Sequence, residues 1–129
     1  MCSSDLLDGM ILKPSMLISC ANASNRADVE TVARETVRCL LNTVPASVAW
    51  ISFLSGGQSD EEASAHLNAM HNLGVDLPWP LTFSYGRALQ QASMKAWDGK
   101  AENVTKAQAI LLERASNNGK AAMGQYNPE

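Results

Sequence analysis

The chain alternates between short apolar runs and longer stretches in which apolar residues recur every three or four positions. The apolar runs cover residues 10–12, 48–54 and 81–85, and continuous apolar sequence of this length is typical of buried strands. The periodic stretches predict helices over about residues 29–44, 60–73, 87–97 and 103–118. Because strands alternate with helices, the sequence predicts an α/β fold with a parallel sheet and right-handed crossovers.

Capping and helix-ending residues mark the ends of the first two predicted helices. We expect Asn25 to cap the first helix and Pro45 to stop it. Ser59 and Glu62 have the spacing of a capping box at the start of the second helix, and Gly74 fits its C-terminus.

The last predicted helix carries apolar residues at helical spacing. We expect its inward face to consist of Val104, Ala107, Ile110, Leu111 and Ala115. Residues 119–129 are rich in glycine and asparagine, and we interpret them as a flexible tail.

Composition and charge exclude several classes of function. With 129 residues, 46% hydrophobic and 18% charged, the chain has the size and composition of one modest globular domain. The net charge is −3 and the sequence contains no basic patch, so we expect no nucleic-acid partner. No apolar run is long enough to span a membrane, so we expect no membrane partner. The three cysteines, Cys2, Cys20 and Cys39, have no CxxC spacing, which favours reduced thiols. Residues 1–7 lack the apolar core of a signal peptide, so we expect a cytoplasmic protein.

A lysine ends the first apolar run. A lysine in this position is often only a solvated surface residue, but Lys13 directly follows apolar neighbours and precedes Pro14. Apolar surroundings disfavour an ammonium ion and so favour the free amine, which can attack a carbonyl carbon. The protonated imine that results is an electron sink, so a neighbouring carbon–carbon bond can break or form.

Glycine-containing clusters follow the other two apolar runs. Ser55, Gly56 and Gly57 follow the second run, and Gly86 and Arg87 follow the third. The first cluster is either a simple strand-to-helix turn or a phosphate cradle, in which glycine lets backbone N–H groups approach an anion closely. The second cluster favours the cradle, because a guanidinium offers a bidentate fork to phosphate. Three successive strand ends therefore indicate one site for a phosphorylated carbonyl compound.

The remaining chemically capable side chains are interpreted as structural. His66 and His71 are not at zinc spacing, and we expect both at the surface. We expect Trp50, Trp79 and Trp97 to be packing residues.

The blocks that carry the three clusters resemble class I fructose-1,6-bisphosphate aldolase. They are Leu12-Lys13-Pro14, Phe53-Leu54-Ser55-Gly56-Gly57-Gln58-Ser59 and Leu81-Thr82-Phe83-Ser84-Tyr85-Gly86-Arg87-Ala88-Leu89. The resemblance extends over about residues 7–126, and the Phe-Leu-Ser-Gly-Gly-Gln-Ser string is highly specific. It implies a TIM (β/α)8 barrel, of which this chain would supply strands six to eight with their helices.

The resemblance also implies an activity and a site. Lys13 would be the Schiff-base lysine, and Ser55, Gly56, Gly86 and Arg87 would hold the substrate phosphate nearest the ketone carbon. The reaction would be reversible cleavage of fructose 1,6-bisphosphate, a phosphorylated sugar, into dihydroxyacetone phosphate and glyceraldehyde 3-phosphate in glycolysis and gluconeogenesis. Because the imine is the electron sink, no metal and no cofactor are expected. The full-length parent would be a homo-oligomer.

The chain also departs from the family's pattern. A complete barrel needs roughly 250 residues, and the family's acidic residues and second lysine on early strands, and its C-terminal tyrosine, have no counterpart here. Ser15 also stands where the family usually has asparagine. We therefore expect residues 7–118 to be the C-terminal part of the barrel, inactive as a fragment.

Residues 1–6 are interpreted as a leader outside the family. The peptide at positions 2–6 is what a common sequencing-adapter string translates to, so the leader is an assembly artefact or, alternatively, an unrelated natural segment. Two alternatives to the aldolase hypothesis remain open: another lysine-Schiff-base aldolase, and a non-catalytic half-barrel that only associates with another chain.

Overall fold

A three-stranded parallel sheet lies at the centre of the chain. The computed structural model describes residues 6–128, so Glu129 and residues 1–5 of the expected leader lie outside the described residues. The strands are β1 (Ile11–Leu12), β2 (Trp50–Phe53) and β3 (Leu81–Phe83), in the order β1-β2-β3. The predicted strands and their parallel pairing are therefore confirmed, although each strand is shorter than its apolar run.

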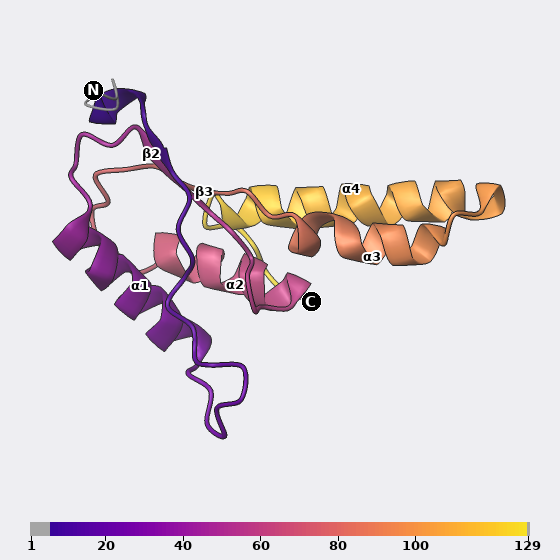
Figure 1. Cartoon of the computed structure of the whole chain (residues 1–129), viewed down its shortest axis with the longest axis horizontal. Coiled ribbons are helices and arrows are strands. Elements are labelled where there is room, and N and C mark those ends of the chain that lie inside the picture. Colours follow the sequence, from indigo (N-terminus) through magenta and orange to yellow (C-terminus); the bar gives the residue numbers. More distant parts are fainter. Residues whose placement is uncertain (1–5, 129) are drawn as a thin grey trace, which may run out of the picture.

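Four α-helices and two short 3-10 helices complete the part of the chain that the structure describes. They are η1 (Leu7–Gly9), α1 (Val29–Thr43), α2 (Asp60–His71), α3 (Arg87–Trp97), η2 (Ala101–Asn103) and α4 (Val104–Ala121). Figure 1 shows α1 and α2 beside the strands, while α3 and α4 run antiparallel to each other and extend away from the sheet. No helix among residues 6–128 is long and apolar enough to cross a membrane.

The apolar core lies between the sheet and the first two helices. Ile51 and Phe53 of β2 are fully buried, as are Leu67 and Met70 of α2. Central strands of parallel sheets are covered in this way, which is why residues 48–54 are almost continuously apolar.

The three tryptophans do not share one environment. Trp79 is buried, and its indole nitrogen donates to the backbone oxygen of Pro45 at 2.8 Å, so its expected packing role is confirmed. Trp50 and Trp97 are both exposed, and the same expectation is wrong for them.

The caps of the first two helices show one prediction confirmed and one corrected. At α2, Ser59 Oγ accepts from Glu62 N at 3.1 Å and Glu62 Oε2 accepts from Ser59 N at 2.8 Å, which completes the predicted capping box. At α1 the cap is Asp28 rather than Asn25, because Asp28 Oδ1 accepts from Thr31 N at 2.7 Å. That hydrogen bond lowers the pKa of Asp28, and a carboxylate also complements the positive end of the helix.

Helix α4 differs from the prediction in its inward face. The buried side chains are Ala107, Arg114, Asn118 and Ala121, whereas Val104, Leu111 and Ala115 are exposed. Apolar spacing alone could not reveal this face, because two of its four members are polar.

The chain beyond residue 118 also differs from the prediction. Helix α4 continues to Ala121, so the expected flexible tail of residues 119–129 begins inside a helix. Beyond the helix, Gly124 O accepts from Asn72 Nδ2 at 3.1 Å and Tyr126 N donates to Asn68 Oδ1 at 2.8 Å. The segment after α4 is thus hydrogen-bonded to Asn68 of α2 and to Asn72, the C-cap residue of α2.

Candidate active site

The five expected site residues follow the carboxyl ends of three adjacent parallel strands. Lys13 directly follows β1, and Ser55 and Gly56 lie just after β2. Gly86 lies between β3 and α3, and Arg87 is the first residue of α3. Carboxyl ends of parallel strands share one edge of a sheet, which is where sites of α/β proteins form.

Backbone hydrogen bonds join the three strand ends. Leu54 N donates to Pro14 O at 3.2 Å, which links the segment after β1 to the end of β2. Ser84 N donates to Phe53 O at 2.8 Å, which links the ends of β2 and β3. The structure therefore brings together the segments that carry all five residues.

Ser55 connects the loop after β2 to the first turn of α3. Its side chain is buried, and its Oγ accepts a hydrogen bond from Ala88 N at 3.5 Å. Ala88 follows Arg87 in the chain, so the serine hydroxyl lies beside the start of α3. Because Oγ is the acceptor in this contact, the hydroxyl proton of Ser55 is free to donate to another group.

The glycines of the two clusters differ in what their backbones require. Gly57 has a φ of 78°, a conformation that disfavours side chains, and a Cβ at Gly56 would lie 2.8 Å from Leu54 Cδ1. Gly86, with φ −81° and ψ −73°, has an ordinary right-handed backbone, and a Cβ there would meet nothing within 4 Å. Packing within the described residues therefore explains the first cluster but not the glycine at position 86.

The predicted desolvation of Lys13 is not found among the described residues. The Lys13 side chain is exposed, as is Ile11, while Leu12 is only half-buried. Strand β1 is an edge of the three-stranded sheet, so no further strand from residues 6–128 covers its outer side. The apolar neighbours of Lys13 in sequence therefore leave the residue exposed.

His66 is buried, contrary to the expected surface position. Its Nδ1 lies 2.6 Å from Gln58 Nε2, which also donates to Met16 Sδ at 3.2 Å. Burial lowers the pKa of His66, Glu62 opposes this shift and Arg26 adds to it. A neutral His66 accepts from Gln58 through Nδ1 and carries its proton on Nε2.

This contact links the two loops that follow β1 and β2. Met16 comes three residues after Lys13, and Gln58 comes two residues after Gly56, so His66 holds both segments against α2. The sequence contains a weak signal for the burial of position 66, because it shares the helical face of Ala63 and Met70.

Arg114 forms a second polar connection that sequence reasoning missed. Its guanidinium is buried and donates through Nε to Ala88 O at 3.1 Å, and through Nη2 to Asp60 O and to Ser64 Oγ, the latter at 2.9 Å. Asp60 and Ala88 lie in the first turns of α2 and α3, which follow the two glycine clusters. Arg114 therefore fixes the two helices whose N-terminal ends border the candidate site.

Other buried polar groups surround this connection. Tyr85 donates through its hydroxyl to Ala63 O at 2.7 Å, and burial raises the pKa of Tyr85. Asn118 Oδ1 accepts from Ser64 Oγ at 2.7 Å, while Asn118 Nδ2 has no hydrogen-bond partner among the described residues.

Within residues 6–128 no three His, Cys, Asp or Glu side chains gather as a metal site would require.

Comparison with known proteins identifies the family. Residues 3–129 match the family model of class-I fructose-bisphosphate aldolase, described as glycolytic. The chain belongs to this family, as the sequence motifs predict. The match begins inside residues 1–6, the segment that we interpret as lying outside the family.

Individual relatives agree with this assignment. The chain is 56% identical over 122 residues to a probable fructose-bisphosphate aldolase class 1 of Xanthomonas campestris pv. campestris, covering 94% of this chain and 36% of that protein. It is 51% identical over 121 residues to the cytosolic fructose-bisphosphate aldolase 4 of Arabidopsis thaliana, covering 94% of this chain and 31% of that protein. The chain thus spans about a third of the length of these relatives.

A solved structure agrees with the predicted fold. The fructose-bisphosphate aldolase of Plasmodium falciparum, determined in complex with TRAP and a small-molecule inhibitor, superposes with a TM-score of 0.91 at 47% sequence identity. The superposition covers 96% of this chain and 35% of the Plasmodium chain. The fold is therefore a partial TIM barrel, as predicted.

Proposed function

We propose that this chain carries the Schiff-base and phosphate-binding part of a class I fructose-bisphosphate aldolase. The reaction is reversible cleavage of fructose 1,6-bisphosphate into dihydroxyacetone phosphate and glyceraldehyde 3-phosphate, in cytoplasmic glycolysis and gluconeogenesis. The observation that carries this proposal is the set of hydrogen bonds that joins the three strand ends bearing Lys13, Ser55 and Arg87.

Lys13 is the nucleophile of this mechanism. Its amine adds to the ketone carbon, and loss of water leaves a protonated imine. When the adjacent carbon–carbon bond breaks, its electron pair moves into the imine to form an enamine, and the hydroxyl of the leaving half gives up its proton to become the aldehyde. Protonation of the enamine carbon and hydrolysis of the imine then release dihydroxyacetone phosphate and restore the lysine.

The other four residues hold the phosphate of the ketone half. Ser55 donates its free hydroxyl proton, and Gly56 and Gly86 offer backbone N–H groups. The glycine at position 86 supports this role, since a Cβ there would meet nothing within 4 Å among the described residues and packing does not explain its presence. Arg87 supplies a charge-assisted hydrogen bond.

We further propose that the 129-residue chain alone does not turn over substrate measurably. Imine formation and bond cleavage both need positioned acids and bases, and each such group typically contributes about 10²–10⁴-fold in rate. The exposed amine of Lys13 supports this proposal, because nothing among the described residues encloses it. The outer edges of β1 and β3, which pair with no further strand of residues 6–128, also favour aggregation of the isolated chain.

A binding experiment tests the phosphate site separately from turnover. Dihydroxyacetone phosphate should shift the backbone amide resonances of Gly56 and Gly86 in a saturable way. Arg87→Gln should weaken this binding by about tenfold or more, whereas the matched variant Arg38→Gln, on the exposed face of α1, should not change it. Equal affinity of the Arg87→Gln variant would contradict the phosphate-binding role.

A coupled assay tests turnover. We expect no release of glyceraldehyde 3-phosphate above background from the purified chain. Turnover near that of an intact aldolase would show that the 129 residues already contain the acids and bases of the reaction.

A second candidate function is association with another chain. Ile11 and Trp50 are register partners in the sheet, and the two residues are 48% and 45% exposed. An exposed apolar pair on a sheet favours a partner surface, and the homo-oligomer proposed for the full-length parent is compatible with it. Light scattering at micromolar concentration that finds only monomer would contradict this candidate.

A further inference from the structure

A polar pocket lies apart from the candidate active site. It has a volume of about 520 Å³ and lies between the first turn of α2, the C-terminal half of α4 and the segment that follows α4. None of the five candidate site residues lines it. Its wall consists mostly of charged and hydrogen-bonding side chains, so its chemistry is that of a polar ligand site rather than of an apolar docking groove.

Arg114 gives the pocket a buried positive charge. The Nε and Nη2 atoms of its guanidinium donate only to neutral oxygens. These are the backbone oxygens of Asp60 and Ala88, Ser64 Oγ and Asn118 Oδ1. Its Nη1 has no hydrogen bond among the described residues, and none of the ion pairs found there includes Arg114. A buried charge without a counter-charge is unfavourable, so an anion in the pocket would stabilise it.

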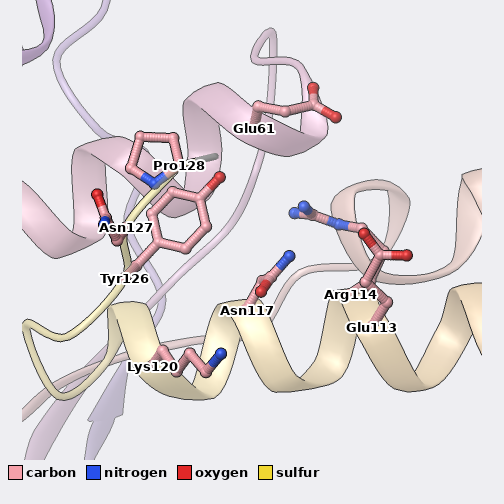
Figure 2. A pocket seen from close by; sticks show the side chains of 8 residues that line it. All are labelled: Glu61, Glu113, Arg114, Asn117, Lys120, Tyr126, Asn127 and Pro128. Carbon is pink, nitrogen blue, oxygen red and sulfur yellow. The ribbon is translucent and has the colours of Figure 1, made fainter.

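Three further donors line the same space. Figure 2 shows the Arg114 guanidinium and the Asn117 amide directed toward one region, with the Lys120 ammonium and the Tyr126 hydroxyl at its border. Two cationic groups and two neutral donors around one cavity match an oxyanion, which can accept several hydrogen bonds at once.

The two carboxylates of the pocket do not cancel this charge. Glu61 and Glu113 are exposed, so water and salt screen them, whereas Arg114 is buried and is screened much less. No ion pair among the described residues joins Glu61 or Glu113 to Arg114.

We propose that this pocket binds a small oxyanion, either the phosphate group of a phosphorylated metabolite or a carboxylate. Arg114 donates through Nη1, and Asn117, Lys120 and Tyr126 supply the remaining donors. The cavity volume lies within the range of small-molecule sites, so it can hold a metabolite larger than the anion itself. Because Arg114 also fixes the first turns of α2 and α3, the bound anion stabilises the region that borders the candidate active site. The proposal does not depend on the aldolase activity.

Nuclear magnetic resonance on the isotope-labelled chain tests this site, with inorganic phosphate and acetate as the probes. We expect phosphate to shift the amide resonances of Asn117 and Tyr126 in a saturable way. Lys120→Gln should weaken this binding by about fivefold or more, because it removes one cationic donor. Arg114 itself is not varied, since it connects three helices.

Two control variants separate the pocket from other anion sites. Lys106→Gln removes an exposed charge from the same helix outside the pocket, and Arg87→Gln removes the cation of the candidate active site; both should leave the affinity at Asn117 within about twofold. Tighter binding of phosphate than of acetate supports a phosphorylated ligand, and the reverse order supports a carboxylate. The absence of saturable shifts at Asn117 and Tyr126, or equal weakening by Lys106→Gln, overturns the proposal.

Discussion

The region around β2 and the α3–α4 hairpin are stabilised by different kinds of contact. Ile51 and Phe53 of β2 and Leu67 of α2 are fully buried in the same apolar core. On the hairpin, which Figure 1 shows extending away from the sheet, Met94 and Leu112 remain 64% and 72% exposed. The first region is held by apolar burial, and the second has little apolar core of its own.

Polar contacts connect the hairpin to the rest of the chain. Arg114 joins α4 to α2 and α3, and Ser64 donates to Asn118 across α2 and α4. Between the two hairpin helices, Ser93 Oγ donates to Ala107 O at 2.7 Å. The comparison shows that a buried guanidinium bonded to neutral oxygens can hold helices together where few apolar side chains are available.

Truncation of a core side chain beside β2 should have the largest effect. Phe53→Ala should lower the free energy of unfolding by about 3–5 kcal/mol, because it removes apolar contacts and leaves a cavity. Leu112→Ala, on the exposed surface of the hairpin, should change it by less than about 0.5 kcal/mol. Urea denaturation measures both, and similar losses would contradict the difference between the two regions.

Removal of the buried guanidinium should have the next largest effect. Arg114→Met should lower the free energy of unfolding by about 2–3 kcal/mol, because buried oxygens of α2 and α3 lose a charged donor. The control Arg38→Met removes an exposed ion pair and should cost less than about 1 kcal/mol. Equal losses in the two variants would mean that Arg114 does not fix the hairpin.

Helix caps should have smaller effects that distinguish the true cap of α1. Asp28→Ala and Ser59→Ala should each lower the free energy of unfolding by about 1 kcal/mol, since each removes the acceptor for a backbone N–H. Asn25→Ala should have almost no effect, because α1 begins at Val29 with Asp28 as its cap. A loss at Asn25 as large as that at Asp28 would contradict this assignment.

Acidification should destabilise the chain modestly through His66. Burial lowers its folded-state pKa, so below about pH 6.5 the unfolded state takes up a proton before the folded state does. The free energy of unfolding should therefore be fully retained above that pH and fall as the pH drops through the lowered pKa of folded His66. Charged groups near the ring are Glu62 on the same helix and Arg26, and Gln58 and Met16 are the neutral neighbours.

A matched variant isolates this contribution. His66→Gln removes the titrating ring and should reduce the loss of unfolding free energy between about pH 7.5 and 5.5. Denaturation curves at both pH values measure it. An unchanged pH dependence in the variant would assign the effect to other groups.

Local patterns were sufficient to predict the parallel sheet, the capping box and the shared edge of the candidate site. Apolar runs report strand burial, and a serine followed three residues later by glutamate reports a helix start; both depend on neighbours in sequence. His66 and Arg114 could not be placed in this way, because their burial depends on Gln58, Asp60 and Ala88 in the folded chain. The exposure of Lys13 was missed for the same reason, since it depends on which strand lies beside β1.

The central claim is that Lys13 reacts as the amine of a site that recognises phosphate. Borohydride trapping followed by peptide mapping tests this directly, with dihydroxyacetone phosphate compared against unphosphorylated dihydroxyacetone. We predict that dihydroxyacetone phosphate labels Lys13 in preference to the other lysines, on the order of tenfold more than dihydroxyacetone does, and that Arg87→Gln removes this preference. Labelling spread evenly over the lysines, with no dependence on the phosphate group, would contradict the claim.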